Sequence, residues 1–329
     1  PLRKLNRFIA LNVLKNFDVN KNLALNELFN LNNKKNKLNI SDLGYLIGPI
    51  LNAGGRLGKS NYATELLSSD DLEVINIKSN ELIKLNNKRK EIETLVLDEI
   101  NFEKIEKENK DVIIYYKANI NEGLIGIIAA RLKDYFNRPS IVITTSNEVL
   151  KGSARSVFNY NIGRGIKNSF DRNLIISGGG HNMAAGFTLQ KNNLKNFENF
   201  ILKDFKNTGS ARDYIFSYDA EISPLAFNRE FYEDVKKLEP FGTGNSTPIF
   251  LFKDLKIIKA KILNEKHVSL VLKSKLGFSI KSISFNSTNK IIGEYLLNYK
   301  KSLNVLGHIN ENFWNNKNSL QLTIRDIIL

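Results

Sequence analysis

Three consecutive runs decide the fold: VIIYYK at residues 112–117, LIGIIAARLKDYF at 124–136 and RPSIVIT at 138–144. The first run is β-branched and aromatic and predicts a strand, and the second has the apolar spacing of a helix. Arg138-Pro139 then breaks the chain before a second apolar strand. A strand, a helix and a strand in this order form a βαβ unit, which predicts an α/β sheet domain over residues 111–208.

Residues 209–329 predict a different kind of domain. Apolar and polar residues alternate there in several short runs separated by turn signals, which is typical of a small β-barrel of the OB-fold kind. A helix over residues 228–238 interrupts the strands. The predicted strands cover residues 214–220, 249–263, 267–273, 278–285, 304–310 and 319–328.

Residues 1–77 show no strand alternation and predict short helices. Residues 78–110 contain neither Gly nor Pro, and their apolar residues recur at three- and four-residue steps among many Lys and Glu. This pattern predicts one long helix that connects two domains. The alternative is a pair of ordinary helices broken near Asn101.

The charge of the chain indicates a class of partner. Its 48 Lys and Arg against 34 Asp and Glu leave a net charge of +14, and the pI is near 9.6. Such a surface favours polyanions. The alternative is a Lys- and Asn-rich composition that reflects coding bias, with lysines that are solvated and bind nothing.

The composition also excludes several classes of protein. The chain has no Cys, so disulfide scaffolds, zinc ribbons, iron–sulfur clusters and thiol nucleophiles are excluded. Its histidines, His181, His267 and His308, are too scattered in sequence to indicate a histidine-built metal site. No apolar run approaches the roughly 20 residues that span a bilayer, and no signal peptide opens the sequence. We therefore expect a cytoplasmic protein without membrane association.

Three glycine-bearing segments, predicted as loops, carry groups suited to phosphate. The SGGGH segment at 177–181 combines backbone N–H groups with an imidazole, and KGSARS at 151–156 offers two hydroxyls and a guanidinium. The segment GPILNAGGRL at 48–57 places another arginine in a glycine turn. Each segment alone is equally consistent with an ordinary turn, but three of them in one basic chain predict phosphate binding.

These segments, in this order and followed by LEPFGTGN at 238–245, resemble the RecJ family of single-strand-specific exonucleases in the DHH phosphoesterase superfamily. The resemblance runs over essentially the whole chain. A Gly-Gly-His element alone is typical of the superfamily, whereas the Pro-Phe-Gly-x-Gly-Asn run and the barrel after it indicate RecJ.

The resemblance implies a fold and an activity. Residues 1–77 would be the C-terminal remnant of a DHH domain, 78–110 a connecting helix, 111–208 the DHH-associated α/β domain and 209–329 the OB-fold nucleic-acid-binding domain. The implied activity is 5′→3′ hydrolysis of phosphodiester bonds in single-stranded DNA, in DNA repair and recombination, by a monomer that uses Mn²⁺ or Mg²⁺.

Aspartates and histidines of the DHH domain hold the metals in this family, and the last of them would fall a few residues before Pro1. We therefore expect no metal ligands in this chain, and no cofactor and no hydrolysis by this chain alone. A two-metal hydrolysis needs carboxylate-held cations to generate hydroxide. The expected partner of the chain is single-stranded DNA.

Carried over residue by residue, the resemblance implies that Ser153, Arg155 and Ser156 hold the 5′-terminal phosphate. Asn52 and Arg56 would line the active-site cleft.

His181 would be the catalytic residue of the segment. With Gly179 and Gly180 it would approach the scissile phosphate. One departure from the family pattern is Asn121, where many members have a histidine, and the Asn121 side chain cannot carry a charge.

In the barrel, aromatic residues are candidates for stacking on bases. Trp314, in the polar segment 310–318 that is predicted to be a loop, is the foremost exposed candidate. His267 and His308 lie on strand patterns and are predicted to be structural. The other stacking candidates are Phe241, Phe250, Phe285 and Phe313.

Two other functions are compatible with the residues. The first is a catalytically inactive scaffold of the same superfamily that holds single-stranded DNA. The second is an oligoribonuclease or cyclic-dinucleotide phosphodiesterase, which the barrel argues against, because a dinucleotide needs no extended platform. Upstream coding sequence with or without Asp and Asp-His-His motifs would separate the enzyme from the scaffold.

Overall fold

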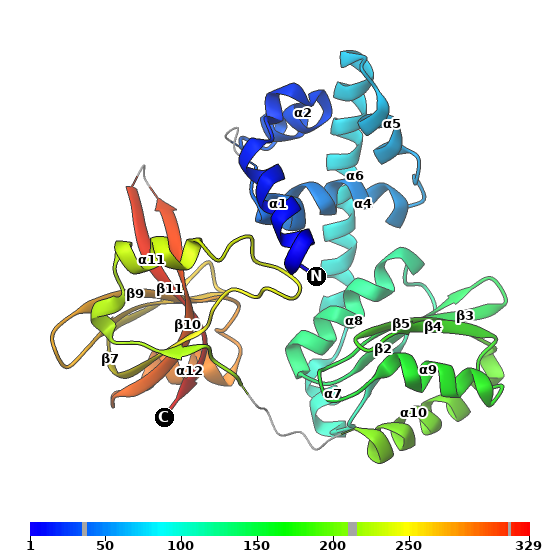
Figure 1. Cartoon of the computed structure of the whole chain (residues 1–329). Coiled ribbons are helices and arrows are strands. Elements are labelled where there is room, and N and C mark those ends of the chain that lie inside the picture. Colours follow the sequence, from blue (N-terminus) through cyan, green and yellow to red (C-terminus); the bar gives the residue numbers. More distant parts are fainter. Residues whose placement is uncertain (35–37, 210–215, 315–316) are drawn as a thin grey trace. The chain divides into compact units, whose positions relative to one another are not determined.

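The computed structural model describes residues 1–34, 38–209, 216–314 and 317–329 of the chain. These residues form two compact units, drawn in Figure 1. The α/β unit covers Asp18–Asp213, and the barrel unit combines Pro1–Phe17 with Tyr214–Leu329. The sequence-based division into four stretches stays a prediction; the compact units group the first residues of the chain with the barrel.

A five-stranded sheet forms the centre of the α/β unit, with the strand order β1-β2-β3-β5-β4. The first two strands are parallel and are connected by helix α8, so the predicted βαβ unit is confirmed. The remaining neighbours are antiparallel, and β4 lies at an edge. The elements are β1 (Ile113–Tyr116), α8 (Glu122–Phe136), β2 (Ser140–Ser146), β3 (Val149–Arg155), β4 (Ser177–His181) and β5 (Ala184–Leu189).

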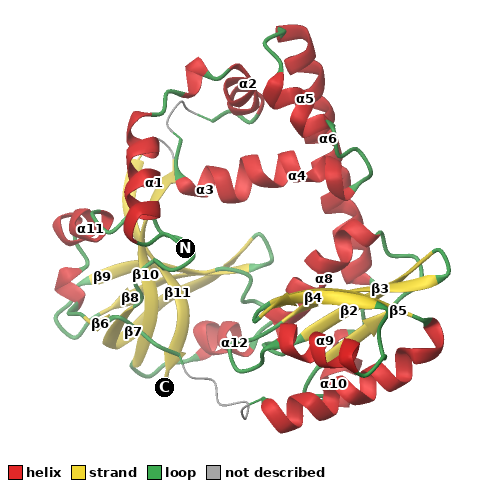
Figure 2. Cartoon of the chain, turned by 45° about the vertical axis from the view of Figure 1, so that its right-hand side comes forward, coloured by secondary structure: helices red, strands yellow, loops and turns green. Residues whose placement is uncertain are grey.

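Helices cover both faces of this sheet, which explains the unbroken apolar run of β2 (Figure 2). Ile141 and Ile143 pack with α9 (Ile162–Asp171) and α10 (Leu194–Thr208), whereas Val142 packs with α8. A strand that is buried on both faces needs apolar residues at successive positions.

The predicted single helix over residues 78–110 is wrong, and the alternative with a break near Asn101 is correct. Helix α6 spans Leu72–Asp98 and α7 spans Phe102–Glu108. The Asn101 side chain starts α7, because its Oδ1 accepts a hydrogen bond from the Lys104 N–H at 2.8 Å.

The remaining elements of the α/β unit are helices. None of the described helices of the chain is long and apolar enough to cross a membrane. The glycine turn predicted for residues 48–57 is wrong, because Gly48–Arg56 forms helix α4. The other elements are η1 (Val19–Lys21), α2 (Leu23–Leu31), α3 (Ile40–Asp42), η2 (Leu43–Ile47), α5 (Tyr62–Ser68) and η3 (Lys191–Asn193).

Five strands of the barrel unit close on themselves in the order β7-β8-β9-β11-β10, and β10 pairs again with β7. The β9–β11 pairing is parallel and the others are antiparallel. This arrangement is an OB-fold barrel and confirms the predicted fold class. The elements are β6 (Ala220–Glu221), η4 (Pro224–Ala226), α11 (Arg229–Lys236), β7 (Phe250–Leu263), β8 (His267–Lys273), β9 (Ser279–Ser284), α12 (Ile291–Asn298), β10 (Leu303–Trp314) and β11 (Lys317–Ile328).

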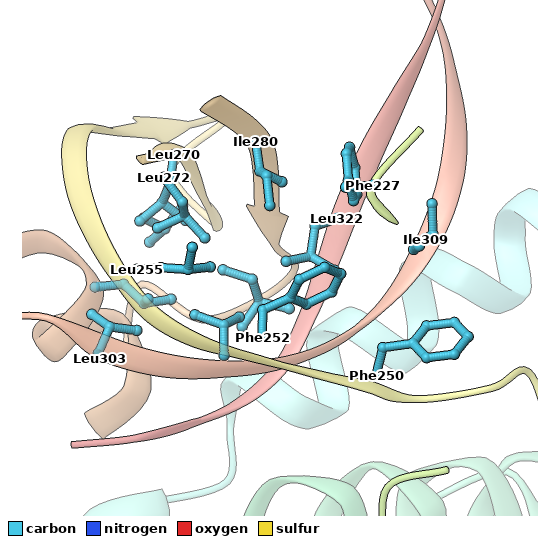
Figure 3. Packing of buried hydrophobic residues seen from close by; sticks show 14 of the residues in the cluster. Phe227, Phe250, Phe252, Leu255, Leu270, Leu272, Ile280, Leu303, Ile309 and Leu322 are labelled. Carbon is cyan, nitrogen blue, oxygen red and sulfur yellow. The ribbon is translucent and has the colours of Figure 1, made fainter. Parts of the chain in front are cut away.

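The barrel core combines the inward side chains of these strands with buried residues of α11 and α12 (Figure 3). Phe252, Leu270 and Leu322 are fully or almost fully buried in it. Phe250 also belongs to this core at 5% exposure, so its prediction as a base-stacking residue is wrong. Burial of an aromatic ring inside the barrel leaves no face for a base.

The first helix, α1 (Lys4–Asn16), is bonded to the segment at 237–244. Arg7 Nη2 donates hydrogen bonds to the carbonyls of Lys237 and Glu239 at 3.0 and 2.9 Å. Arg3 Nε donates to the carbonyl of Gly244 at 2.8 Å. The segment that distinguishes the family in the sequence is thus fixed to the start of the chain.

His308 of β10 is a structural residue. Its Nδ1 lies 2.8 Å from the Pro248 carbonyl oxygen, which can only accept a hydrogen bond. Burial lowers the pKa of its imidazole, which is the largest influence on it. A histidine whose pKa is lower in the folded than in the unfolded chain stabilises the fold above its unfolded pKa, about 6.5.

We therefore expect the unfolding free energy to fall as the pH drops below about 6.5, the ordinary histidine pKa, because the unfolded chain binds the proton first. Thermal unfolding at several pH values between 8 and 5 measures this for the wild type and for His308→Gln. The variant should lose less stability than the wild type over this pH interval. Equal losses would show that His308 does not contribute.

Candidate functional site

Strand β3 presents Ser153 and Arg155 on one face of the sheet, because alternate residues of a strand point the same way. Ala154 between them is fully buried on the other face. The predicted loop at 151–156 is therefore mostly a strand. Arg155 Nη1 donates hydrogen bonds to Ser153 Oγ at 3.1 Å and to the Ala154 carbonyl at 2.8 Å, which fixes the guanidinium at the end of the strand.

Helix α8 leaves room for this guanidinium at Gly126. A Cβ atom at that position would lie 2.9 Å from Arg155 Nη2 and 3.0 Å from Ser153 Oγ. Any side chain there would displace Arg155, so the glycine is part of the site.

Arg56, at the end of α4, contacts the start of α8. Its Nη1 donates a hydrogen bond to the Gly123 carbonyl at 2.9 Å, and a Cβ atom at Gly123 would lie only 2.2 Å from the Arg56 carbonyl oxygen. Asn121, at the position where the family often has histidine, begins α8, because its Oδ1 accepts from the Gly123 N–H at 2.9 Å. Asn52 is exposed one turn before Arg56 on α4.

These arginines lie in a group that we call the arginine cluster, formed by Arg56, Arg89, Arg131 and Arg155 with Glu93. Glu93 is buried and accepts from Arg89 at 2.8 Å and from Arg131 at 2.7 Å. It is the carboxylate that offsets the positive charges along α6 and α8.

Two members of the arginine cluster, Arg56 and Arg155, have lowered pKa values. Burial lowers the pKa of Arg155, and the charge of Arg56 lowers it further. Burial and then Arg89 lower the pKa of Arg56, against the opposing effect of Glu93. Partly desolvated like charges repel one another, so a bound anion would relieve them. A planar guanidinium also matches the geometry of a phosphate.

Ser156 is placed differently from Ser153. It is only 1% exposed, its Oγ donates to the Tyr160 carbonyl at 2.7 Å, and its N–H donates to the Met183 carbonyl at 2.9 Å. A phosphate contact through this hydroxyl would require breaking the first bond. In this conformation Ser156 fixes the turn that follows β3.

The SGGGH segment is edge strand β4 rather than the predicted loop, and all of its residues are exposed. It forms one wall of a cavity of about 900 Å³. Helix α9 comes close at Gly163, where a Cβ atom would lie 2.8 Å from the His181 carbonyl oxygen. The lining residues are Asn161, Gly163, Arg164, Lys167, Gly178, Gly179, Gly180, His181, Asn182, Met183 and Ala184.

The structure therefore brings His181, Gly179 and Gly180 together in this cavity. Arg155 and His181 both pair with Ala184, which lies on β5 between their strands. Because neighbouring strands are about 4.8 Å apart, the Cα atoms of Arg155 and His181 lie roughly 10 Å apart. Arg155 and His181 thus lie at the same end of the sheet. The arginine cluster is on the face covered by α8, and the cavity cations Arg164 and Lys167 are on α9, which covers the other face.

Two cations of the cavity, Arg164 and Lys167, were missed by sequence reasoning. They are three residues apart on the exposed side of α9, so they share one helix face. Their signal in the sequence was the Arg-x-x-Lys spacing just after the KGSARS segment.

The residues of this site do not fit a resident metal. The described part of the chain contains no group of three or more His, Cys, Asp and Glu that could hold one. His181 shares the cavity with Arg164 and Lys167, whose charges repel a cation. The charged side chains that line this cavity are thus the cations Arg164 and Lys167, without a carboxylate among them.

On the barrel unit, a row of lysines follows the outer face of strands β7, β8 and β9. Lys256 pairs with Lys273, and Val271 lies between Lys259 and Lys281 in the register. None of these lysines forms an ion pair with any other residue that the structure describes. We call Lys256, Lys259, Lys261, Lys273 and Lys281 the lysine face.

The aromatic candidates of the barrel differ in position. Phe285 is 52% exposed beside β9, and its ring meets the His267 ring edge-on at 5.2 Å between centroids. Phe241 packs against the barrel core. The predicted loop around Trp314 is wrong in part, because β10 continues to Trp314, which pairs with Lys317. The side chains of Phe313 and Trp314 lie outside the described residues.

Comparison with known proteins defines the class of the chain. Residues 109–207 match the DHHA1 domain model, and residues 218–326 match the model of the RecJ OB domain. The chain thus combines a DHHA1 domain with an OB barrel.

The curated relatives narrow this class further. RecJ, the single-stranded-DNA-specific exonuclease of Haemophilus influenzae, is 31% identical over 86% of this chain and 52% of its own length. The Bacillus subtilis RecJ is 28% identical over 99% of this chain and 42% of its own length. The chain is therefore a relative of RecJ and carries the DHHA1 and OB domains of that family. It spans about half the length of the curated relatives it matches.

A solved structure supports the fold. The crystal structure of RecJ with Mn²⁺ from Thermus thermophilus matches with a TM-score of 0.82 at 22% identity. The match covers 99% of this chain and 47% of that one.

Proposed function

We propose that this chain is the substrate-binding portion of a RecJ-like 5′→3′ exonuclease that acts on single-stranded DNA in repair and recombination. The observation that carries this proposal is the position of Arg155 and Arg56. These partly buried guanidinium groups, one bonded to Ser153 and the other to the Gly123 carbonyl, lie close enough for their charges to repel, so an anion is favoured there. The relatives are named as exonucleases for single-stranded DNA.

In this proposal, the guanidinium of Arg155 binds the 5′-terminal phosphate, and Ser153 orients it. Arg56 and the exposed Asn52 line the same cleft. The next phosphate enters the cavity along β4, where the glycines allow close approach to the backbone and His181 faces the phosphate. His181 would stabilise the charge that develops on the reacting phosphate.

Divalent metals supply the hydroxide for such a hydrolysis in the family. The described residues of this chain provide no ligand set for them, so we propose that the chain alone does not hydrolyse DNA. Purified chain should leave 5′-labelled single strands intact with Mn²⁺. Mn²⁺-stimulated degradation that His181→Ala abolishes would contradict this. A monomeric state and a cytoplasmic location are parts of the same proposal.

A catalytically inactive scaffold that holds single-stranded DNA is the second candidate function. The lysine face of the barrel suits it, because such a surface holds a strand without any hydrolysis. It shares the DNA-binding surface with the first candidate, and the two differ only in the activity of the complete protein.

Binding by the barrel should show two separable contributions. Replacing Lys259 and Lys281 by Ala should reduce the salt dependence of binding by roughly 0.7 in log–log slope for each phosphate that is no longer neutralised. Stacking is largely independent of salt, so Phe285→Ala and Trp314→Ala should each weaken binding by a similar factor at all salt concentrations, worth about 1–3 kcal/mol for a stacked base.

Titration of a fluorescent single strand across a salt series tests this. Lys253→Ala is the matched control, because Lys253 lies on β7 and its charge is paired with Glu221 at 2.7 Å. An unchanged slope in the Lys259→Ala, Lys281→Ala variant would remove the lysine face from the interface. A preference for duplex DNA would contradict the proposed function.

A further inference from the structure

Phe158 is the feature of the α/β unit that the proposed function leaves unexplained. It is 94% exposed on the turn between β3 and α9. Isolated apolar residues are common on protein surfaces, but this one lies within a few residues of both anion-binding parts of the site.

The turn that carries Phe158 is fixed on both sides. Ser156 donates to the Tyr160 carbonyl at 2.7 Å, and the Tyr160 N–H donates to the Val157 carbonyl at 3.2 Å. Tyr160 is itself buried, and its hydroxyl donates to Asp204 at 2.8 Å. The backbone at Phe158 is therefore held in place, so its ring is presented to solvent from a fixed position.

The position of Phe158 suits a nucleotide. It follows Arg155 by three residues and precedes Asn161, which lines the cavity, by three. Three residues span at most about 11 Å. The Cα atom of Phe158 therefore lies within about 11 Å of the Cα atoms of Arg155 and Asn161.

The cavity is larger than a phosphate requires. Its volume of about 900 Å³ lies in the range of roughly 300–1,000 Å³ that is usual for sites of whole small molecules. Arg164 and Lys167 are exposed on one face of α9, and within the described chain neither forms an ion pair. The half-exposed Met183 adds apolar surface to the lining.

We propose that this region is a nucleotide subsite, in which Arg164 and Lys167 bind a backbone phosphate of single-stranded DNA and Phe158 stacks on the adjoining base. The inference rests on the proposed function and adds the residues that recognise the base. Stacking on an aromatic ring requires an unpaired base, and every base has a suitable face. The subsite would therefore favour single strands without preferring a sequence.

Tryptophan fluorescence tests the stacking step directly. The chain has one Trp, so a Phe158→Trp, Trp314→Phe variant carries its only indole at position 158. We expect its emission to be quenched by a 5′-phosphorylated oligothymidylate and not by an abasic deoxyribose-phosphate strand of equal length. Absence of quenching at saturating oligothymidylate would overturn the proposal.

Affinity provides the second measurement. Phe158→Ala should weaken binding of the oligothymidylate roughly 5- to 150-fold and leave binding of the abasic strand unchanged, whereas Arg164→Ala should weaken both. Phe170→Ala is the matched control, because Phe170 is 49% exposed near the end of α9 and does not line the cavity. This variant should bind both strands like the wild type.

Equal loss on both strands in Phe158→Ala, or no loss on either, would overturn the stacking role while the proposed function stands. Failure of the wild type to bind any single strand would overturn the proposed function as well. The two failures are thus distinguishable.

Discussion

Arg155→Ala should lower the affinity of the chain for a 5′-phosphorylated single strand much more than its affinity for the same strand with a 5′-hydroxyl. A charge-assisted contact between a guanidinium and a phosphate contributes about 1.5–3 kcal/mol, which corresponds to roughly 10- to 150-fold in affinity. Arg155→Lys should retain part of this preference, because it keeps the charge and loses the planar fork. Competition titrations with the two strands measure the ratio.

The matched control is Arg172→Ala, at the C-terminal end of α9, where the guanidinium lies over the Phe200 ring at 5.1 Å. Removing this arginine takes away the same charge and should leave the preference for the 5′-phosphate unchanged. Equal losses on both strands in Arg155→Ala would make Arg155 a general backbone contact or a structural residue.

Gly123→Ala should both destabilise the α/β unit and abolish its preference for a 5′-phosphate. The new Cβ atom would lie 2.2 Å from the Arg56 carbonyl oxygen and 2.8 Å from its carbonyl carbon. Backbone atoms cannot rotate away, so the end of α4 must shift and Arg56 moves with it. Overpacking of this kind costs about 1–3 kcal/mol, and thermal unfolding and strand competition measure the two effects.

Gly55→Ala is the control, because Gly55 belongs to the same helix α4 and a Cβ atom there would meet no atom within 4 Å. It should raise stability by up to about 1 kcal/mol, since alanine is the better helix former. If Gly123→Ala melts like the wild type and retains the preference, then contact between α4 and α8 does not position Arg56.

The sequence was sufficient to predict the sheet and the barrel because their apolar patterns are strong. Both the continuous apolar run in β2 and the alternation in β8 depend on burial alone. Strand β8 spans His267–Lys273, as predicted. Helix α12 was missed, since its eight residues lie between strands and include Gly293.

The glycine segments were predicted less well. The SGGGH and KGSARS segments were predicted as loops, but they pair with β5 in one sheet. Glycine lowers the local preference for a strand, and only the neighbouring strand overrides it. At Gly152, a Cβ atom would meet the Phe187 ring at 2.1 Å, so the reason for this glycine lies in a residue distant in sequence.

The candidate site was also predicted only in part from the sequence. Its glycines, serines and arginines were visible as segments, whereas the buried carboxylate of Glu93 and the cavity cations Arg164 and Lys167 became apparent only when α6, α8, α9 and β4 were placed together. The choice between Phe250 and Phe285 as exposed rings also required the register of the barrel, because one residue of displacement exchanges the inner and outer faces.

The bonds between α1 and the segment at 237–244 have a consequence for synthesis. Arg3 and Arg7 find their carbonyl partners 241 and 230 residues later in the chain. During translation the α/β unit is complete before either partner exists, and domains generally fold as they emerge. Helix α1 therefore cannot form these bonds until the barrel residues have been synthesised. Phe8 and Ile9 of this helix are exposed even in the final fold. Assembly of the barrel unit is thus the last step in the folding of these residues.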